Sequence, residues 1–335
     1  MRILVTGGAG FIGSEFVRAT LQRRLPESAG TSVTVLDALT YSGNLPNLAP
    51  VADKRGFRFV HGDICDAELV DSVLPGHDAV VHFAAETHVD RSLVSAAQFA
   101  RSNVVGTQVM LEAALRHGVR RFVHVSTDEV YGSIDEGSWT EETPLAPNVP
   151  YAAAKAGSDL FALAYHRTFG LDVVVTRCTN NYGHHQFPEK LIPLFVTTLL
   201  DGGRLPLYGD GGNARDWLHV SDHCDAIQRV LLGGRAGEVY HVGGGRELTN
   251  LELTARLLDA FGTSWDVVDR VADRQGHDRR YSLDITKIKR ELGYAPSVDF
   301  EEGLARTVAW YRAHPEWWRP LQQRALLTPS TASAA

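Results

Sequence analysis

The sequence predicts an α/β protein, a doubly wound parallel sheet joined to a second, smaller mixed α/β domain. In the first half of the chain, short apolar segments typical of buried parallel strands alternate with segments of helical periodicity. A glycine-rich turn separates the first strand from the first helix. The 335 residues suffice for two lobes. We expect the larger domain at residues 1–178 with later returns around 215–243, the smaller one mostly at 179–320, and a flexible tail at 321–335.

Composition excludes several classes of partner. The net charge of −7 predicts no basic surface of the kind that nucleic acids bind, and no apolar run reaches the roughly 18 residues of a membrane helix. The N-terminus begins as a strand pattern without a secretory leader. Cys65, Cys178 and Cys224 are odd in number and widely spaced, which favours reduced thiols over disulfides or a metal site. We therefore expect a cytoplasmic protein with no metal, no nucleic acid and no membrane among its partners.

The first strand, Arg2–Val5, runs directly into a glycine-rich turn. Gly7, Gly10 and Gly13 follow at three-residue spacing, and residues 14–25 have an amphipathic helical pattern. Between a strand and a helix this spacing is typical of a dinucleotide site, because glycines let the backbone approach a pyrophosphate that the helix N-terminus attracts. A plain glycine turn is the alternative. The strand, turn and helix together predict the Rossmann arrangement.

The second strand, residues 31–36, ends at an acidic residue. Asp37 lies 24 residues beyond Gly13, close to where a carboxylate should accept hydrogen bonds from the ribose hydroxyls of a dinucleotide. A negative charge at this position would repel the additional phosphate of NADP, so the sequence favours NAD as the cofactor. The alternative is that Asp37 only caps a loop.

Two further strands are predicted at residues 57–61 and 78–83. The second of these is almost entirely apolar, as expected in a parallel sheet that is covered on both faces. The residues after these strands are positioned to contact an adenine or to let a cofactor pass close to the backbone: Asp63 and Ile64 after the third strand, Ala84 and Ala85 after the fourth. A helix N-cap would explain Asp63 or Asp66 equally well. Residues 103–116 are predicted to form a helix.

The fifth strand, residues 121–125, leads to a hydroxyl and two adjacent carboxylates, Thr127, Asp128 and Glu129. Ligands of open α/β sheets bind outside the carboxyl ends of the strands, so these side chains are catalytic candidates. Successive strand residues point to opposite faces, so both carboxylates reach one ligand only if the backbone leaves strand geometry after Thr127. A solvated acidic turn is the alternative.

Tyr151 and Lys155 are four residues apart in a helix predicted over residues 151–169, which places them on one helical face. A free tyrosine has a pKa near 10 and is a poor base at neutral pH. A neighbouring ammonium and the positive ring of an oxidised nicotinamide would both favour the phenolate. The pair is therefore a candidate for catalysis and for cofactor binding.

These residues resemble the extended short-chain dehydrogenase/reductases, and Thr127–Gly132 resembles the signature of the dTDP-glucose 4,6-dehydratases. Related epimerases and decarboxylases share the glycine loop and the Tyr-Lys pair but usually lack the Asp-Glu pair. The resemblance covers about residues 1–315. Its motifs are the glycine loop at 7–13, including Phe11 and Ile12, and the segments at 84–92, 151–155, 180–183 and 188–193.

The resemblance implies an NAD-dependent lyase that converts dTDP-glucose to dTDP-4-keto-6-deoxyglucose and water. Tyr151 would take the proton of the sugar 4-hydroxyl while a hydride moves to NAD, and Thr127 would bond near the 4-oxygen. Glu129 would then remove the C5 proton, Asp128 would protonate the departing 6-hydroxyl, and the hydride would return to C6. Asp128 needs a raised pKa for this task, which burial or the charge of Glu129 would provide.

The second half reads as a less regular lobe that returns to the sheet. Strands are expected at 171–177 and 239–242 and a helix at 187–200. The resemblance implies that Arg215 and Arg274 bind the diphosphate, since a guanidinium suits phosphate oxygens. Each assigned residue could instead be a solvated surface residue. The remaining substrate-binding residues that it implies are Thr87, Asn180, Glu189, Lys190, Leu191, Pro206, Tyr208, Asn250, His277 and Tyr281.

The chain departs from the family at His184 and His185, where the family usually has Pro-Tyr. Without the proline a backbone N–H is restored, and we expect the two histidines to face water rather than substrate. A 4-epimerase and a non-catalytic nucleotide-sensing protein of the same fold remain alternatives, because fold alone does not determine function. The family implies a homodimer in which the helices at 103 and 151 form a four-helix bundle.

Overall fold

The computed structural model describes residues 1–326, and a seven-stranded sheet forms its centre. All pairings in this sheet are parallel, and the strand order is β10-β6-β5-β4-β1-β2-β3. The prediction of a doubly wound parallel sheet is confirmed. The strands are β1 (Arg2–Thr6), β2 (Ser32–Asp37), β3 (Phe57–His61), β4 (Ala79–His82), β5 (Arg121–Thr127), β6 (Val173–Cys178) and β10 (Val239–Val242).

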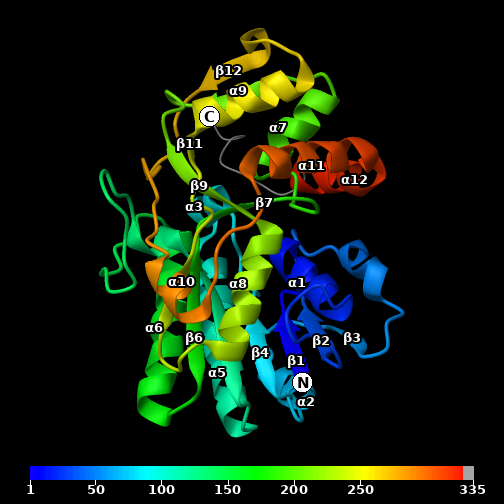
Figure 1. The fold of residues 1–335 in the computed structure, drawn as a ribbon, viewed down its shortest axis with the longest axis vertical. Helices are drawn as coiled ribbons and strands as arrows, with labels where there is room; N and C mark the ends of the chain where they lie inside the picture. The colour runs from blue at the N-terminus through cyan, green and yellow to red at the C-terminus, as the bar shows by residue number, and fades with distance from the viewer. Residues whose placement is uncertain (327–335) are drawn as a thin grey trace.

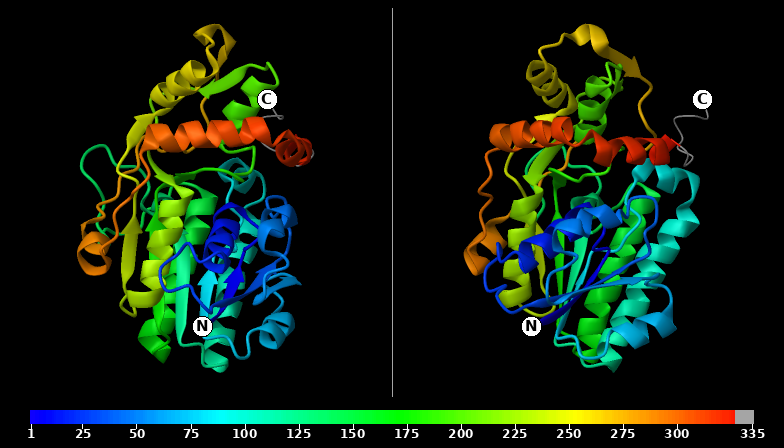
Figure 2. Two further views of the ribbon diagram at one scale, coloured as in Figure 1. Left: turned by 45° about the vertical axis from the view of Figure 1, so that its right-hand side comes forward. Right: turned by 90° about the vertical axis from the view of Figure 1, so that its right-hand side faces the viewer.

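Helices cover both faces of this sheet, which is why its strands are apolar throughout (Figures 1 and 2). Successive residues of β1 belong to different cores: Ile3 and Val5 to one, Leu4 to the other. The helices of the first core are α1 (Phe11–Leu21), α8 (Val220–Gly233) and α10 (Thr286–Leu292). Those of the second are α2 (Ala67–Val73), α5 (Gly106–Arg116) and α6 (Pro150–Phe169).

A smaller lobe lies beyond the carboxyl ends of the central strands (Figure 1). Its core contains Phe195, Leu257 and Tyr311, each fully or almost fully buried. One sheet joins β11 (Glu247–Thr249), β9 (Ala214–His219) and β7 (Asn180–Tyr182), and another pairs β12 (Val268–Val271) with β8 (Leu205–Tyr208). The helices of the lobe are α7 (Leu191–Leu200), α9 (Asn250–Phe261), α11 (Phe300–Ala313) and α12 (Pro315–Leu326).

The chain crosses between the lobes more than once. After β9 it returns to the large sheet through α8 and β10, and α10 packs against β10. β9 itself falls in the segment expected to return, 215–243, but it pairs with β7 and β11 in the small lobe. A short polar strand such as β9 carries no signal for which sheet it joins, because only tertiary pairing decides this.

Six short helical segments connect these elements. The helix expected from residue 103 begins as a π-helical turn, η2 (Ala100–Val105), which continues into α5. The others are η1 (Leu45–Val51), α3 (Val89–Val94), α4 (Ala96–Phe99), η3 (Asp128–Tyr131) and η4 (Trp265–Val267).

The expected tail at 321–335 has to be corrected in its first part. Residues 321–326 complete helix α12, Trp318 belongs to the core of the small lobe, and Leu321 is buried. Burial of these apolar side chains stabilises the helix where composition alone suggested fraying. Residues 327–335 lie outside the described part of the chain. No helix within residues 1–326 has the length and apolar character needed to cross a membrane.

Candidate active site

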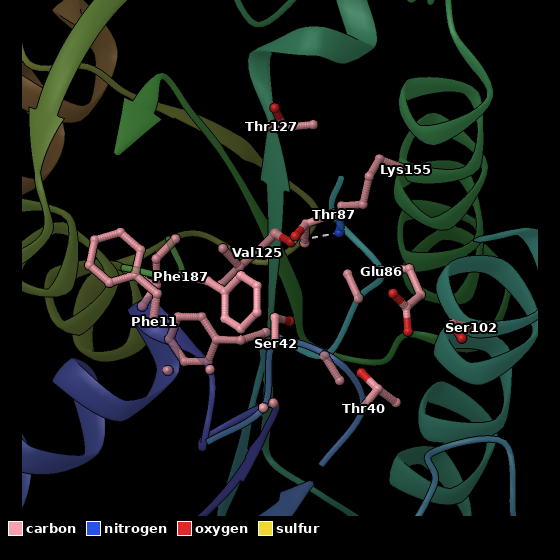
Figure 3. A pocket seen from close by; sticks show the side chains of 18 of the residues that line it. Phe11, Thr40, Ser42, Glu86, Thr87, Ser102, Val125, Thr127, Lys155 and Phe187 are labelled. Carbon is pink, nitrogen blue, oxygen red and sulfur yellow. Dashed lines mark hydrogen bonds between the residues drawn. The ribbon is translucent and has the colours of Figure 1, made fainter. Parts of the chain in front are cut away.

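Two adjoining cavities lie at the carboxyl ends of the central strands. The first, which we call the sheet-edge cavity, runs over β1, β2, β4 and β5 and is shown in Figure 3. The second, the lobe cavity, lies between the sheet and the small lobe. Four residues line both cavities and so mark their junction: Glu129, Asn180, Glu189 and Lys190.

All the residues predicted to bind the cofactor line the sheet-edge cavity. The glycines there are required by close approach: a Cβ on Gly7, whose φ is +67°, would lie 2.6 Å from the Ala84 amide nitrogen. A Cβ on Gly13 would lie 2.3 Å from the carbonyl oxygen of Gly7. The turn is therefore a cradle that only backbone can line. The set is Gly7, Gly10, Phe11, Ile12, Gly13, Asp37, Asp63, Ile64, Ala84, Ala85, Tyr151 and Lys155.

Asp37 both lines the cavity and organises its floor. Its carboxylate accepts hydrogen bonds from the amides of Ala9 and Leu39, each at 2.8 Å, so it joins the glycine turn to the end of β2. Burial raises the pKa of this carboxyl, and the two amide donors oppose the shift. At the end of β3, Asp66 is the N-cap of α2, whereas Asp63 accepts a hydrogen bond from Cys65 within its own loop and faces the cavity.

The backbone leaves strand geometry immediately after Thr127. This departure is what the sequence analysis required for Asp128 and Glu129 to reach the same ligand. Thr127 is still extended, with φ −140° and ψ 156°, and the next four residues form the 3₁₀ turn η3. Thr127 Oγ1 accepts the amide N–H of Glu129 at 3.3 Å and donates to Asp128 Oδ1 at 3.2 Å. Asp128 and Glu129 consequently line the same cavity.

Asp128 has the surroundings of a protonated carboxyl. Its residue is 2% exposed, and Oδ2 is buried without a hydrogen-bond partner. Burial, followed by the charge of Glu129, raises the pKa of Asp128 well above its usual range. Burial also raises the pKa of Glu129, while the cations of Lys190 and Arg215 act in the opposite direction. Arg215 lowers the pKa of Asp128 as well, so the two adjacent carboxyls are distinguished by the Lys190 cation, which lowers the pKa of Glu129.

Tyr151 and Lys155 lie on the first turns of α6, and both side chains line the cavity. Lys155 Nζ donates to the carbonyl oxygen of Val125 at 2.8 Å, as Figure 3 shows. The spacing predicted that this ammonium would favour the phenolate. Instead, burial and then the charge of Glu129 raise the pKa of Tyr151 well above its usual value.

The lobe cavity collects most of the predicted substrate-binding residues. The Arg215 guanidinium lies 4.2 Å from the ring centroid of Tyr281 and donates to the carbonyl oxygen of Asp278 at 2.9 Å. Arg274 lies 3.5 Å from Asp90, and its Nε is buried without an acceptor. Predicted residues that line this cavity are Asn180, Glu189, Lys190, Leu191, Pro206, Tyr208, Arg215, Asn250, Arg274, His277 and Tyr281, whereas Thr87 lines the sheet-edge cavity.

Contacts between loops close the junction of the two cavities. Arg91 donates to Glu189 Oε2 at 3.0 and 3.1 Å, and Lys190 Nζ donates to the carbonyl oxygen of Thr87 at 3.0 Å. The segment after β4 and the segment before α7 therefore meet over the end of β5. In the sequence, only the polar composition of residues 86–92 pointed to such contacts, and it did not identify Glu189 and Lys190 as the residues contacted.

Several lining residues were not predicted. They come from segments whose approach to the site depends on tertiary structure: the loop after β2, the segment after β4, the π-helical turn η2, the segments before α7 and α10, and strand β9. In the sheet-edge cavity they include Thr40, Ser42, Gly43, Glu86, Ser102, Gln186 and Phe187, and in the lobe cavity His88, Asp90, Trp217 and Asp278.

The expectation that His184 and His185 face water is wrong for His185, whereas the His184 side chain is 30% exposed. His184 Nε2 lies 3.2 Å from Glu15 Oε2 on α1. The His185 ring packs 4.4 Å from Trp310 and 5.3 Å from Trp317, measured between centroids. The aromatic side chains of α11 and α12 cover this loop, a contact between segments more than a hundred residues apart that no local pattern reveals.

The strand order, the glycine cradle and the Tyr-Lys pair define an extended short-chain dehydrogenase/reductase. The family model for GDP-mannose 4,6 dehydratase matches residues 4–307. The chain is 69% identical to the dTDP-glucose 4,6-dehydratase of Streptomyces niveus, covering 100% of this chain and 99% of the relative. It is 64% identical to that of Streptomyces antibioticus, over 97% and 96% of the two chains. The chain therefore belongs to the GDP-mannose 4,6 dehydratase family, and its resemblance to the dTDP-glucose 4,6-dehydratases is confirmed.

Solved structures agree with this assignment. The dTDP-glucose 4,6-dehydratase DesIV from Streptomyces venezuelae, with NAD and TYD bound, superimposes with a TM-score of 0.95 at 65% identity, covering 96% of this chain and 100% of that one. The dTDP-glucose 4,6-dehydratase of Bacillus anthracis, in complex with NAD, gives 0.89 at 49% identity over 96% and 99%. A UDP-glucose 4-epimerase of Thermotoga maritima gives 0.86 at 33% identity over 94% and 100%.

Proposed function

We propose that this protein is a dTDP-glucose 4,6-dehydratase, an NAD-dependent lyase that converts dTDP-glucose to dTDP-4-keto-6-deoxyglucose and water. One observation carries the proposal. The turn η3 places the carboxyls of Asp128 and Glu129 in the same cavity as Tyr151 and Lys155. A single sugar held there can be oxidised by one pair of groups and dehydrated by the other.

The residues of the sheet-edge cavity fit a dinucleotide. The backbone cradle of Gly7 and Gly13 leaves no room for a side chain and suits a pyrophosphate at the N-terminus of α1. Asp37 would accept from the adenosine ribose and would disfavour the additional phosphate of NADP. When bound, NAD would take a hydride from C4 of the sugar and return it to C6. Asp63, Ile64, Ala84 and Ala85 would hold the rest of the cofactor.

Oxidation at C4 is assigned to Tyr151 and Lys155, with Thr127 near the 4-oxygen. Tyr151 would accept the proton of the 4-hydroxyl. Since the protein's own groups raise the pKa of Tyr151, its phenolate depends on positive charge supplied next to it. The Lys155 ammonium, held on the Val125 carbonyl oxygen, would supply part of that charge.

Elimination of water is assigned to Glu129 and Asp128. Once C4 is a ketone, the C5 hydrogen is acidic, and Glu129 would remove it as the general base. Asp128, whose pKa is raised by burial and by the adjacent charge, would retain a proton near neutral pH and donate it to the departing 6-hydroxyl. The different surroundings of two neighbouring carboxyls would separate the acid from the base.

The lobe cavity would hold the nucleotide part of the substrate. Arg215 and Arg274, which reach it from different elements, would bind the diphosphate. The buried, unpartnered Nε of Arg274 is a donor available to a phosphate oxygen. Thr87 in the sheet-edge cavity and Asn180, Glu189 and Lys190 at the junction of the cavities would contact the sugar. The nucleoside end would contact Leu191, Pro206, Tyr208, Asn250, His277 and Tyr281.

A nucleotide-sugar 4-epimerase is the second candidate, because an epimerase shares this fold at a TM-score of 0.86. The decisive experiment incubates the purified protein with NAD and dTDP-glucose and analyses the nucleotide sugar by mass spectrometry. A dehydratase yields a product lighter by one water. An epimerase yields an isomer of unchanged mass, and a non-catalytic nucleotide-sensing protein yields no product.

We further propose that the enzyme is a cytoplasmic homodimer. The three cysteines are unpaired in the structure, as expected in a reducing compartment. Helix α6, which packs against α5, exposes Leu160, Phe161 and Phe169 at 57%, 40% and 55%. Exposed apolar side chains of this kind fit pairing of α5 and α6 with their copies in a second subunit. Sedimentation of the purified protein would test this, and a monomeric mass would contradict it.

A further inference from the structure

Tyr131 is the last residue of the turn η3, and it is anchored on side chains that line neither cavity. It is 3% exposed, and its hydroxyl lies 2.6 Å from His241 Nε2 and 2.5 Å from Arg177 Nη1. Its ring stacks on Trp139, with centroids 5.1 Å apart. A four-residue 3₁₀ turn has almost no internal hydrogen bonding, so such side-chain anchors must fix its orientation.

The anchor continues to the helix that carries the Tyr-Lys pair. Arg177 Nε, on β6, donates to Asp159 Oδ2 on α6 at 2.9 Å. Asp159 lies four residues after Lys155 and eight after Tyr151, so the three share one face of α6. Asp159 Oδ1 lies 3.2 Å from His124 Nε2 on β5, the strand that leads into η3.

Resting on the proposed function, we propose that Tyr131, Arg177 and Asp159 are positioning residues that hold the turn η3, with its two carboxylates, against helix α6, with its Tyr-Lys pair. The oxidation groups and the elimination groups come from different elements, and one substrate must meet both sets. Within residues 1–326, the hydroxyl of Tyr131, the guanidinium of Arg177 and the carboxylate of Asp159 form a buried polar connection between η3 and α6. It consists of short contacts between side chains of residues that are at most 3% exposed.

Charge pairing between Arg177 and Asp159 stabilises this connection. Burial opposes the charge of Asp159, but its contact with His124 and the charge of Arg177 outweigh it and lower the pKa of Asp159 to about 2. The Arg177 cation is thus paired with a permanent anion and still has an N–H directed at Tyr131. Removal of the phenolic oxygen would leave the Arg177 N–H donor and the His241 Nε2 acceptor, both buried, without a partner, and η3 would lose its tether while the ring remained packed.

The test is Tyr131→Phe in the NAD-loaded protein, with Tyr294→Phe as the matched control. Tyr294 is fully buried and donates to the carbonyl oxygen of Gly243 at 3.2 Å, outside both cavities. We expect Tyr131→Phe to lower kcat about 10- to 100-fold, because small misplacements of catalytic groups have effects of this size. KM for dTDP-glucose should change less than about twofold, since the binding residues are untouched. Rapid quenching should reveal accumulated 4-keto-glucose nucleotide, because elimination slows more than oxidation.

A second measurement does not depend on catalysis. Hydrogen–deuterium exchange should increase at residues 128–132 in Tyr131→Phe and remain unchanged in β1, β4 and the control variant. Unchanged kcat together with unchanged exchange would overturn the proposal, as would an equal loss of kcat in Tyr294→Phe. Failure of the proposed function looks different: the wild-type protein would not dehydrate dTDP-glucose, while the local difference in exchange would persist.

Discussion

The hydroxyl of Thr127 accepts the amide N–H of Glu129 at 3.3 Å. This contact lies where strand β5 ends and the turn that carries Asp128 and Glu129 begins. The threonine acts as the N-cap of a four-residue turn. Because the cap is also directed at the cavity, one side chain sets the backbone path of two carboxylates and is itself within reach of a ligand.

We expect Thr127→Val to lower kcat by at least about 10-fold and to reduce stability by about 1 kcal/mol, the usual cost of losing an N-cap. Thr127→Ser keeps the hydroxyl and should restore most of both quantities. Steady-state kinetics and thermal unfolding of the two variants measure this. Equal activities in Thr127→Val and Thr127→Ser would remove the hydroxyl from the mechanism.

Asp128→Asn should abolish dehydration and change how stability depends on pH. The folded-state pKa of Asp128 is raised above the unfolded value near 3.8, so its contribution is present below that value and is lost as pH rises toward the folded pKa. The melting temperature of the wild type should therefore fall over this window relative to that of Asp128→Asn. Parallel melting curves of the two proteins from pH 4 to 8 would contradict the assignment.

Lys155→Met should lower kcat by about 10²- to 10⁴-fold, the range for a lost participant in proton transfer. The cause is loss of the ammonium near Tyr151, with an unsatisfied Val125 carbonyl as a second effect. Lys289→Met, at an exposed position of α10, is the control and should retain full activity. Burst experiments that follow C4 oxidation alone should show the same loss as kcat.

Gly13→Ala should weaken NAD binding severely, because its Cβ would lie 2.3 Å from the backbone oxygen of Gly7 and neither group can move without opening the turn. Gly233→Ala is the control, since its Cβ would meet only the end of the Leu292 side chain at 3.3 Å. Calorimetric titration with NAD measures both affinities. Comparable binding by Gly13→Ala and wild type would argue against a pyrophosphate in the cradle.

Glu15→Gln should reduce stability by about 3–5 kcal/mol, because it removes a buried partner of Arg18, at 2.8 Å, and of His184, at 3.2 Å. Asp201→Asn breaks the exposed pair with Arg319 and should cost less than about 1 kcal/mol. Despite burial, His184 and Arg18 lower the pKa of Glu15, so its stabilising effect is present above the usual carboxyl range and is lost as pH falls through the lowered pKa. Urea unfolding of both variants at neutral and acid pH tests this.

Local sequence was sufficient for the central sheet and for the candidate residues on it. Apolar strands, the glycine spacing and an acid at the end of β2 depend on chain geometry within a few residues, and the strand ends of a parallel sheet meet at one edge. This is why Gly7, Asp37, Thr127 and Tyr151, predicted separately, line one cavity.

The sequence by itself determined the class of fold and the sheet edge at which the cavities lie, and its resemblance to a known family picked out the adjacent pair of carboxyls. Tertiary structure alone decided that η3 turns both carboxyls into one cavity, that burial and the charge of Glu129 raise the pKa of Tyr151, and that His185 packs on Trp310 rather than facing water. The physical reason is the distance along the chain over which each effect acts. Propensity and periodicity act over a few neighbouring residues, whereas burial and electrostatics depend on side chains that only folding brings together.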